Sequence, residues 1–385
     1  MVASPLFSRA DETGSLSNVA HRIETLDALR GFLALGVATH HGIIYYHYLL
    51  SGAWRAPPSA VFNQLGRASV GLFFIITAYL FWEKALRAKG VADFAALLTG
   101  RFFRIAPVYC FLMLVATLVG LIAAGFVIRE PLTTLLGEGA QNFAFGALPV
   151  TPFNGVNIRQ HFAGVTWTLV YEWRFYLFLP LVAFLPLRRS LGIVMVAIIV
   201  ASIMSWRTHQ LHFALIALFL WGILCAIAKQ RNFLLGLSSW IYSTISLFAF
   251  AAVYILFHRT FAGPVPAILL ALGFYAILCG GDMFGLLNLK PARRLGAISY
   301  DLYLVHGLIL ATAFAVPEIK TVALSSPAAY WLTLGGIVFV ALAAALMLRV
   351  LIELPGLAAG RRLRDSLAPN GVRQAEDASE YARTT

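Results

Sequence analysis

Long stretches of apolar residues, each about long enough to cross a lipid bilayer, restrict the fold of this chain most. A spanning helix needs about 20 predominantly apolar residues. Ten stretches meet or approach that length, near residues 25–50, 68–83, 104–128, 165–187, 190–206, 210–228, 239–257, 264–281, 296–316 and 328–352. Because lipid cannot satisfy backbone polar groups, each stretch is predicted to be a helix. The sequence therefore predicts an all-α polytopic membrane protein, a bundle of about ten transmembrane helices.

The composition fits a chain that is covered by lipid. Of the 385 residues, 60% are hydrophobic and 12% are charged, whereas a soluble domain is about 45–50% apolar and about 25% charged. Phosphate-binding lysine loops, dinucleotide-binding glycine motifs, nucleophile-elbow serines and zinc-protease helices are not found. The three cysteines lie in apolar stretches without metal-ligand spacing, so we expect no metal.

The distribution of Lys and Arg predicts the orientation in the membrane. If the N-terminus is inside, most of the 29 basic residues fall in the inner loops and the two tails, as the positive-inside rule requires. We therefore expect both termini to be cytoplasmic, with residues 1–22 and 357–385 as polar tails around a membrane domain at 23–356. The longest outer loop spans about 129–164. The net charge of +12 then follows from topology, and no nucleic-acid partner is needed.

Charged and polar residues inside the first predicted span mark a candidate site. Arg30 and His41 are eleven residues apart, so on a helix they point the same way, about 16 Å apart along the axis. Asp27 shares their face. Ionisable groups within membrane helices are costly and by default indicate a site. The alternative is an arginine that reaches back to the membrane surface and a histidine that is hydrogen-bonded in the core.

Two further segments carry arginines or a carboxylate at the ends of spans. Arg101 and Arg104, three residues apart, can hold a phosphate from one helix face, although basic residues at span ends also arise from topology alone. Glu172 and Tyr176 lie one turn apart in the fourth span. This glutamate is either functional or part of a structural ion pair between helices.

A polar stripe interrupts the ninth span. Ser299, Tyr303 and His306 recur at helical spacing on an otherwise apolar helix. Such a stripe serves either a substrate or a set of hydrogen bonds between helices.

These segments, taken in order, resemble the acyltransferase 3 family of bacterial membrane acyltransferases. The matching pieces are Leu26-Asp27-Ala28-Leu29-Arg30-Gly31 with His41, Gly71-Leu72-Phe73-Phe74-Ile75-Ile76, Arg101-x-x-Arg104-Ile105-Ala106-Pro107, Trp167-Thr168-Leu169 with Glu172, Phe175 and Tyr176, Ser299-Tyr300 with Tyr303-Leu304-Val305-His306, and Glu353-Leu354-Pro355. They extend over about residues 24–356. Thr77-Ala78 departs from the Ser-Gly pair usual in the family, which affects helix packing or acceptor contacts there.

The resemblance implies transfer of an acyl group, usually acetyl, from cytoplasmic acyl-CoA to a hydroxyl of a carbohydrate, for example a cell-surface glycan on a lipid carrier. It implies a multi-pass protein of the bacterial plasma (inner) membrane. It also implies that the pair Arg30 and His41 and the pair Arg101 and Arg104 are functional.

The residues suit that chemistry. Arg30, Arg101 and Arg104 would bind the phosphates of acyl-CoA, and His41 would act as a general base or accept the acyl group itself. Glu172 would orient His41, hold the sugar or activate its hydroxyl. Three alternatives remain open: a proton-coupled transporter, a longer donor such as succinyl-CoA, and a small secondary metabolite as acceptor.

Overall fold

A computed structural model describes residues 7–87, 91–183, 190–234, 236–257, 261 and 263–367, with side chains described from residue 24 onward except at 87, 91–93, 183 and 367. Most of these residues are helical, and the strand-like pairing in the described part of the chain is a single isolated bridge between Phe153 and Val156. The elements are α1 (Phe7–Ser51), α2 (Ala60–Arg87), α3 (Val91–Ala123), α4 (Leu132–Asn142), α5 (Ile158–His161), α6 (Trp167–Ala183), α7 (Leu191–Thr208), α8 (Leu211–Gln230), α9 (Ser239–Leu256), α10 (Pro264–Leu278), η1 (Leu286–Asn288), α11 (Lys290–Ala297), α12 (Ser299–Ala315), α13 (Pro317–Leu324), α14 (Pro327–Leu348), η2 (Arg349–Glu353) and α15 (Leu354–Leu367).

Each of the ten predicted stretches coincides with a helix, and the protein is a multi-pass membrane protein with an all-helical fold. Six described segments are long and apolar enough to span a bilayer: Ala60–Leu86, Phe94–Ala123, Leu191–Thr208, Leu211–Gln230, Ser239–Leu256 and Pro327–Ser366. A seventh results if α11 and α12, which are bent by 69° at their junction, are taken together. The number of ten spans and the cytoplasmic termini stay predictions.

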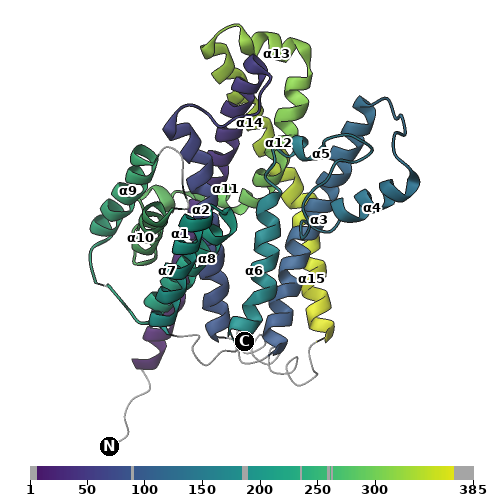
Figure 1. The fold of residues 1–385 in the computed structure, drawn as a ribbon. Coiled ribbons are helices and arrows are strands. Elements are labelled where there is room, and N and C mark those ends of the chain that lie inside the picture. Colours follow the sequence, from purple (N-terminus) through teal and green to yellow (C-terminus); the bar gives the residue numbers. More distant parts are fainter. Residues whose placement is uncertain are drawn as a thin grey trace, which may run out of the picture.

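The predicted tails overlap two long helices. Helix α1 begins at Phe7, so its backbone extends through most of the predicted tail 1–22. Helix α15 extends to Leu367, and the rest of the predicted tail 357–385 lies outside the described residues. The first residues of α1 and the last residues of α15 lie at the same end of the bundle, the lower end in Figure 1, which we call the terminal end. Helices α4, α5 and α13 lie toward the opposite end, which the predicted topology places outside and which we call the outer end.

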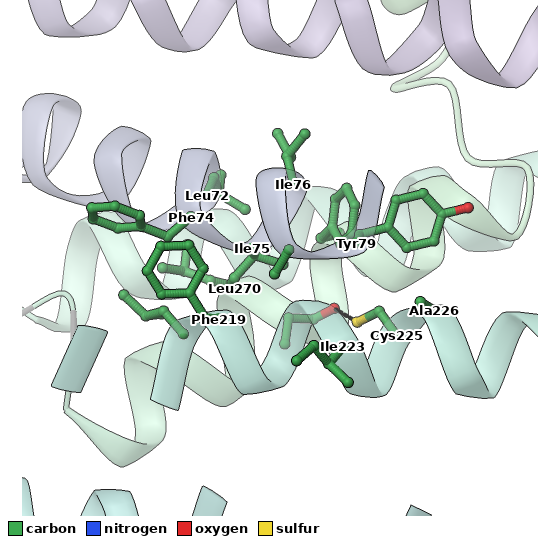
Figure 2. Packing of buried hydrophobic residues seen from close by; sticks show 14 of the residues in the cluster. Leu72, Phe74, Ile75, Ile76, Tyr79, Phe219, Ile223, Cys225, Ala226 and Leu270 are labelled. Atoms are coloured by element: carbon green, nitrogen blue, oxygen red, sulfur yellow. Dashed lines mark hydrogen bonds between the residues drawn. The ribbon is translucent and has the colours of Figure 1, made fainter. Parts of the chain in front are cut away.

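Helix α2 lies in the centre of the largest apolar core and packs against α1, α8 and α10. Its residues Leu72, Phe74 and Ile75 contact side chains of α8 and α10, as Figure 2 shows for this cluster. Helices α2 and α8 come close at Ala78, because residue 222 of α8 is a glycine. Ala78 is part of the departure from the family pattern. Burial of the apolar faces of α2 holds the helices that carry the site in a fixed arrangement.

The predicted outer loop, residues 129–164, folds onto the bundle. Phe143, Val150 and Phe153 pack against a second core cluster formed by α1, α3, α12 and α14. Buried Asn154 organises the loop: its side-chain oxygen accepts from the backbone N–H of Arg129, and its amide donates to the carbonyl of Val127. This loop therefore covers one face of the bundle at its outer end.

Two glycines let α1 and α11 cross at close range. A Cβ atom at Gly31 would collide with the backbone of Leu295 and Gly296, and one at Gly296 would overlap the backbone carbonyl of Asp27. The crossing fixes the depth of the α1 turn that carries Asp27 and Arg30. A side chain at either position would displace that turn.

We therefore expect Gly296→Val to lower the stability of the folded protein by about 1–3 kcal/mol, the usual cost of overpacking. Gly335→Val is the matched control, because a Cβ atom at Gly335 meets open space. Thermal unfolding of both variants in detergent, followed by size-exclusion chromatography, checks this. Equal melting of the two variants would contradict the close crossing.

Candidate active site

Two histidines from distant parts of the sequence contact each other inside the bundle. His41 lies on α1 and His306 on α12, and His41 Nδ1 lies 3.0 Å from His306 Nε2. The two rings are stacked, with centroids 5.1 Å apart. His306 is 1% exposed, so its ring is fixed by this contact and by its own helix.

The hydrogen bonds of His306 determine where the protons lie. His306 Nδ1 is 3.0 Å from the Leu302 carbonyl oxygen, and because a carbonyl only accepts, this nitrogen carries the proton. The Nε2 atom of neutral His306 therefore accepts from Nδ1–H of His41. Neutral His41 is left with an unprotonated Nε2, which is the atom that can accept a proton from a bound molecule.

His41 lines a hollow of about 790 Å³, which we call the histidine hollow. Its walls also include His40, Arg67, Trp167 and Tyr303. His40 is held by a 2.7 Å contact between its Nδ1 and the Phe62 carbonyl, as expected for a core histidine. His40 is buried and His41 is partly exposed, so His41 is the more accessible of the two imidazoles in this hollow.

The three predicted arginines meet in a second hollow, nearer the terminal end, which we call the arginine hollow. Arg30 from α1 and Arg101 and Arg104 from α3 line it together with Glu172 of α6 and Ser299 of α12. The structure thus brings together residues from all four candidate segments. Such a chamber, with three guanidinium groups and one carboxylate, suits an anionic ligand.

Neighbouring side chains hold Arg30 and Arg101. Arg30 lies 3.4 Å from the carboxylate of Asp27, one turn earlier on α1. The guanidinium of Arg101 lies over the ring of Phe81, 4.2 Å from its centroid, and 5.5 Å from that of Tyr176. Stacking of this kind leaves the N–H edges of the guanidinium available for hydrogen bonds.

Arg104 is fixed by a buried carboxylate. Its Nε atom lies 3.3 Å from Glu353, which is 1% exposed, and Arg349 lies 2.9 Å from the other oxygen of the same carboxylate. Arg349 and Glu353 belong to the π-helical turn η2, between α14 and α15. Since Arg104 uses Nε for this ion pair, its terminal NH₂ groups remain to face a ligand.

Glu172 lies with the arginines and not with His41. It accepts a 2.7 Å hydrogen bond from the hydroxyl of Tyr176, and it lines the arginine hollow but not the histidine hollow. The partner that orients His41 in this structure is His306. A catalytic role of Glu172 stays a prediction, one that now concerns the arginine hollow.

Tyr303 separates the two hollows. Together with Val70 it lines both of them, and its hydroxyl is 2.9 Å from Thr168 Oγ1. Arg30 and His41, predicted to face one polar hollow, therefore line two adjoining ones. Ser299, the remaining residue of the predicted stripe, is buried on the arginine side, and its Oγ has no hydrogen-bond partner among the described residues.

Two more hollows continue this series toward either end of the bundle. On the outer side, Ala163 and Gly164 are shared with a hollow of about 820 Å³ whose walls include Tyr48, Trp54, Arg159 and Gln160. At the terminal end, Arg101 and Arg104 are shared with a basic hollow of about 740 Å³. The four hollows follow one another from one end of the bundle to the other.

Sequence reasoning missed two features of the site. It treated His306 as a member of a polar stripe, although the residue is the partner of His41, and it gave no role to Arg349. A charged residue inside an apolar span was the available signal for Arg349. No group of three or more His, Cys, Asp or Glu side chains suited to a metal occurs among the described residues.

The arrangement of these residues agrees with a known family. Residues 23–350 match the sequence model of acyltransferase 3 proteins, described as an acyltransferase domain. The chain belongs to the acyltransferase 3 family. It is also similar to Nodulation protein 10 of Rhizobium leguminosarum bv. viciae, with 26% identity over 329 residues, 77% of this chain and 85% of that protein. No solved structure matches the chain.

Within this family assignment, His306 is testable as a positioning residue. We expect His306→Ala to lower kcat of acyl transfer about 100-fold or more, because a base that is not oriented loses most of its effect. The KM for the donor should stay unchanged. His306→Gln, whose side-chain oxygen can still accept from His41 Nδ1–H, should recover part of the loss. Steady-state kinetics of the purified variants checks both expectations, and equal kcat for His306→Ala and wild type would contradict the role.

Proposed function

We propose that this acyltransferase transfers an acyl group, acetyl in the first place, from acyl-CoA to a hydroxyl of a carbohydrate. The observation that carries the proposal is the sequence of hollows, because a basic chamber at one end adjoins a chamber with an oriented histidine. A donor and an acceptor can thereby approach one imidazole from opposite sides of the membrane.

The arginine hollow supports acyl-CoA as the donor. Arg30, Arg101 and Arg104 come from two helices and surround one volume, which suits an extended polyanion with several phosphates. The pantetheine arm would pass Tyr303 so that the thioester reaches His41. A longer donor such as succinyl-CoA would make the same contacts with the arginines. Acetyl is therefore proposed because it is the usual acyl group of the family.

The outer hollow supports a carbohydrate acceptor. Trp54, 38% exposed, and Tyr48 offer aromatic faces, while Arg159 and Gln160 offer polar groups that can bond to hydroxyls. A sugar, possessing apolar ring faces and many hydroxyls, suits such walls better than an apolar metabolite does. The acceptor would reach His41 from this side, carried by a lipid in the outer leaflet.

The proposed reaction is direct general-base catalysis. His41 Nε2 removes the proton of the acceptor hydroxyl while the oxygen attacks the thioester carbon. A C–O bond forms, the C–S bond breaks, and the thiolate of CoA takes up the proton from the imidazolium. The neutral Nε2 of His306 accepts from His41 Nδ1–H throughout, which keeps the ring oriented. A two-step path through an acyl-imidazole uses the same groups.

Glu172 is proposed to act on the donor side. Its carboxylate lies in the arginine hollow and binds the hydroxyl of Tyr176, whose ring lies beside Arg101. This arrangement would hold Arg101 in place for a phosphate.

We also propose that the chain crosses the membrane ten times, that both termini are cytoplasmic and that the protein lies in the bacterial plasma membrane.

Release of thiol from acetyl-CoA by the purified full chain tests the proposed function, since a transporter frees no CoA. Membrane glycolipids from the source cells serve as the acceptor mixture. Mass spectrometry of surface glycans from cells lacking this chain should then reveal the loss of an acyl substituent. Absence of thiol release with every acceptor fraction would overturn the proposal.

Replacement of the base gives the clearest prediction. His41→Ala and His41→Gln should abolish acyl transfer, because neither alanine nor glutamine accepts a proton near neutral pH. The abundance of both variants in the membrane should stay near that of wild type. His47→Ala is the matched control, since His47 lies on the same helix but lines none of the four hollows. Acylated product from either His41 variant, measured by mass spectrometry, would contradict the assignment.

Replacement of Arg30 should affect the donor alone. For Arg30→Ala we expect KM for acetyl-CoA to rise about tenfold with kcat preserved, as loss of one charge-assisted contact predicts. Arg55→Ala, beyond the opposite end of α1, should leave KM unchanged. Steady-state kinetics over a range of acetyl-CoA concentrations distinguishes the two, and a fall in kcat at constant KM would place Arg30 with the chemical step.

A further inference from the structure

We infer that the basic hollow at the terminal end is a separate subsite for the phosphorylated ribose of the donor, where Lys84, Arg361 and Arg364 recognise the 3′-phosphate of CoA. This inference rests on the proposed use of acyl-CoA and goes beyond it, because it assigns donor recognition to α15 and the end of α2. Neither segment belongs to the four candidate segments of the sequence.

Three helices contribute cations to this one hollow. Lys84 comes from α2, Arg101 and Arg104 from α3, and Arg361 and Arg364 from α15, around a volume of about 740 Å³. The other lining residues are apolar or glycine, and none is acidic. Five positive side chains, of which Arg104 is already paired with Glu353, line this hollow and form a site for an anion.

The cations repel one another in the folded protein. The charges of Arg101, Arg104 and Arg364 act unfavourably on Lys84, and the charge of Glu83 acts favourably on it. Arg361 and Arg364 form no ion pair with another described residue, in contrast to Arg104, which is bound to Glu353. An anion with more than one negative charge would remove this repulsion, and a phosphate monoester carries such a charge at neutral pH.

The place of the hollow relative to the arginine hollow indicates which anion fits. Arg101 and Arg104 line both volumes, so one ligand can extend from the basic hollow past these two arginines toward Tyr303 and His41. Coenzyme A has the required form, with a phosphorylated nucleotide at one end, a diphosphate next to it and a long neutral arm that ends in the sulfur. Acyl phosphate or acyl-pantetheine lacks the nucleotide end.

Backbone geometry keeps the hollow open. A Cβ atom at Gly360 of α15 would collide with the ring of Phe103, so glycine here lets α15 lie close to α3. At Gly100, in the wall of the hollow, the space where a side chain would stand is empty. The close contact brings the α15 arginines to the same opening as Arg101.

Equilibrium binding of CoA and of dephospho-CoA, which lacks the 3′-phosphate, to the full chain in phosphatidylcholine nanodiscs tests the inference. Calorimetry should give an affinity for CoA about tenfold or more above that for dephospho-CoA, the size expected for charge-assisted contacts. Arg364→Ala should lose this difference by weakening CoA alone. Arg362→Ala is the matched control, because Arg362 is exposed on the same helix but does not line the hollow.

The outcomes separate the inference from the proposed function. Equal affinities for CoA and dephospho-CoA in the wild type overturn the subsite, while acyl-CoA stands as donor. If the wild-type protein binds neither CoA nor dephospho-CoA, acyl-CoA is not the donor and the proposed function is wrong. A second set of nanodiscs contains phosphatidylglycerol. If this lipid displaces CoA from the wild type but not from Arg364→Ala, and CoA and dephospho-CoA bind equally, the hollow binds a lipid headgroup. That result would contradict the inference.

Discussion

The buried carboxylate of Glu353 forms the ion pairs on which the arginine hollow depends. An arginine inside an apolar bundle must be paired or must face water or a ligand. Glu353 binds Arg349 and the Nε atom of Arg104 at once, and the π-helical turn brings Arg349 and Glu353 into position. The pairing holds Arg104 at the wall between two hollows, where its remaining N–H groups can meet a ligand. Asp301, fully buried, adds a second acid to this charge cluster.

In the histidine hollow, too, the number of buried charges is kept low. A carboxylate that oriented His41 would introduce another charge into the centre of the bundle, where desolvation is costly. The structure uses a neutral imidazole instead, and the backbone carbonyl of Leu302 fixes its tautomer. The cost is a weaker stabilisation of the imidazolium than an acid would give. Tyr303, bonded to Thr168, stands between this hollow, which Arg67 lines, and the arginine hollow with its three arginines, so the two differ in charge.

The sequence predicted the membrane class and the helices well, because apolar length and charge are local properties. It also predicted that Arg30, Arg101, Arg104 and Glu172 mark a site, and the structure brings all four to one hollow. The contact between His41 and His306 could not be predicted, since 265 residues separate the two and no periodicity links α1 to α12. Helix periodicity likewise placed Arg30 and His41 on one face but could not reveal that Tyr303, from another helix, lies between their hollows.

In the proposed function, the order of the hollows means that group transfer across the membrane need not move either substrate through it. The cations lie toward the terminal end, the neutral base lies in the middle, and the aromatic residues Tyr48 and Trp54 lie toward the outer end. A polyanion would be held by the three arginines of the first set, whereas beyond Tyr303 the hollows present Arg67 and, farther out, Arg159 as single cations. The neutral pantetheine arm is not held by these arginines. In the proposed function, the polarity of the walls would therefore let the acyl group reach the imidazole while the phosphates of the donor stay behind.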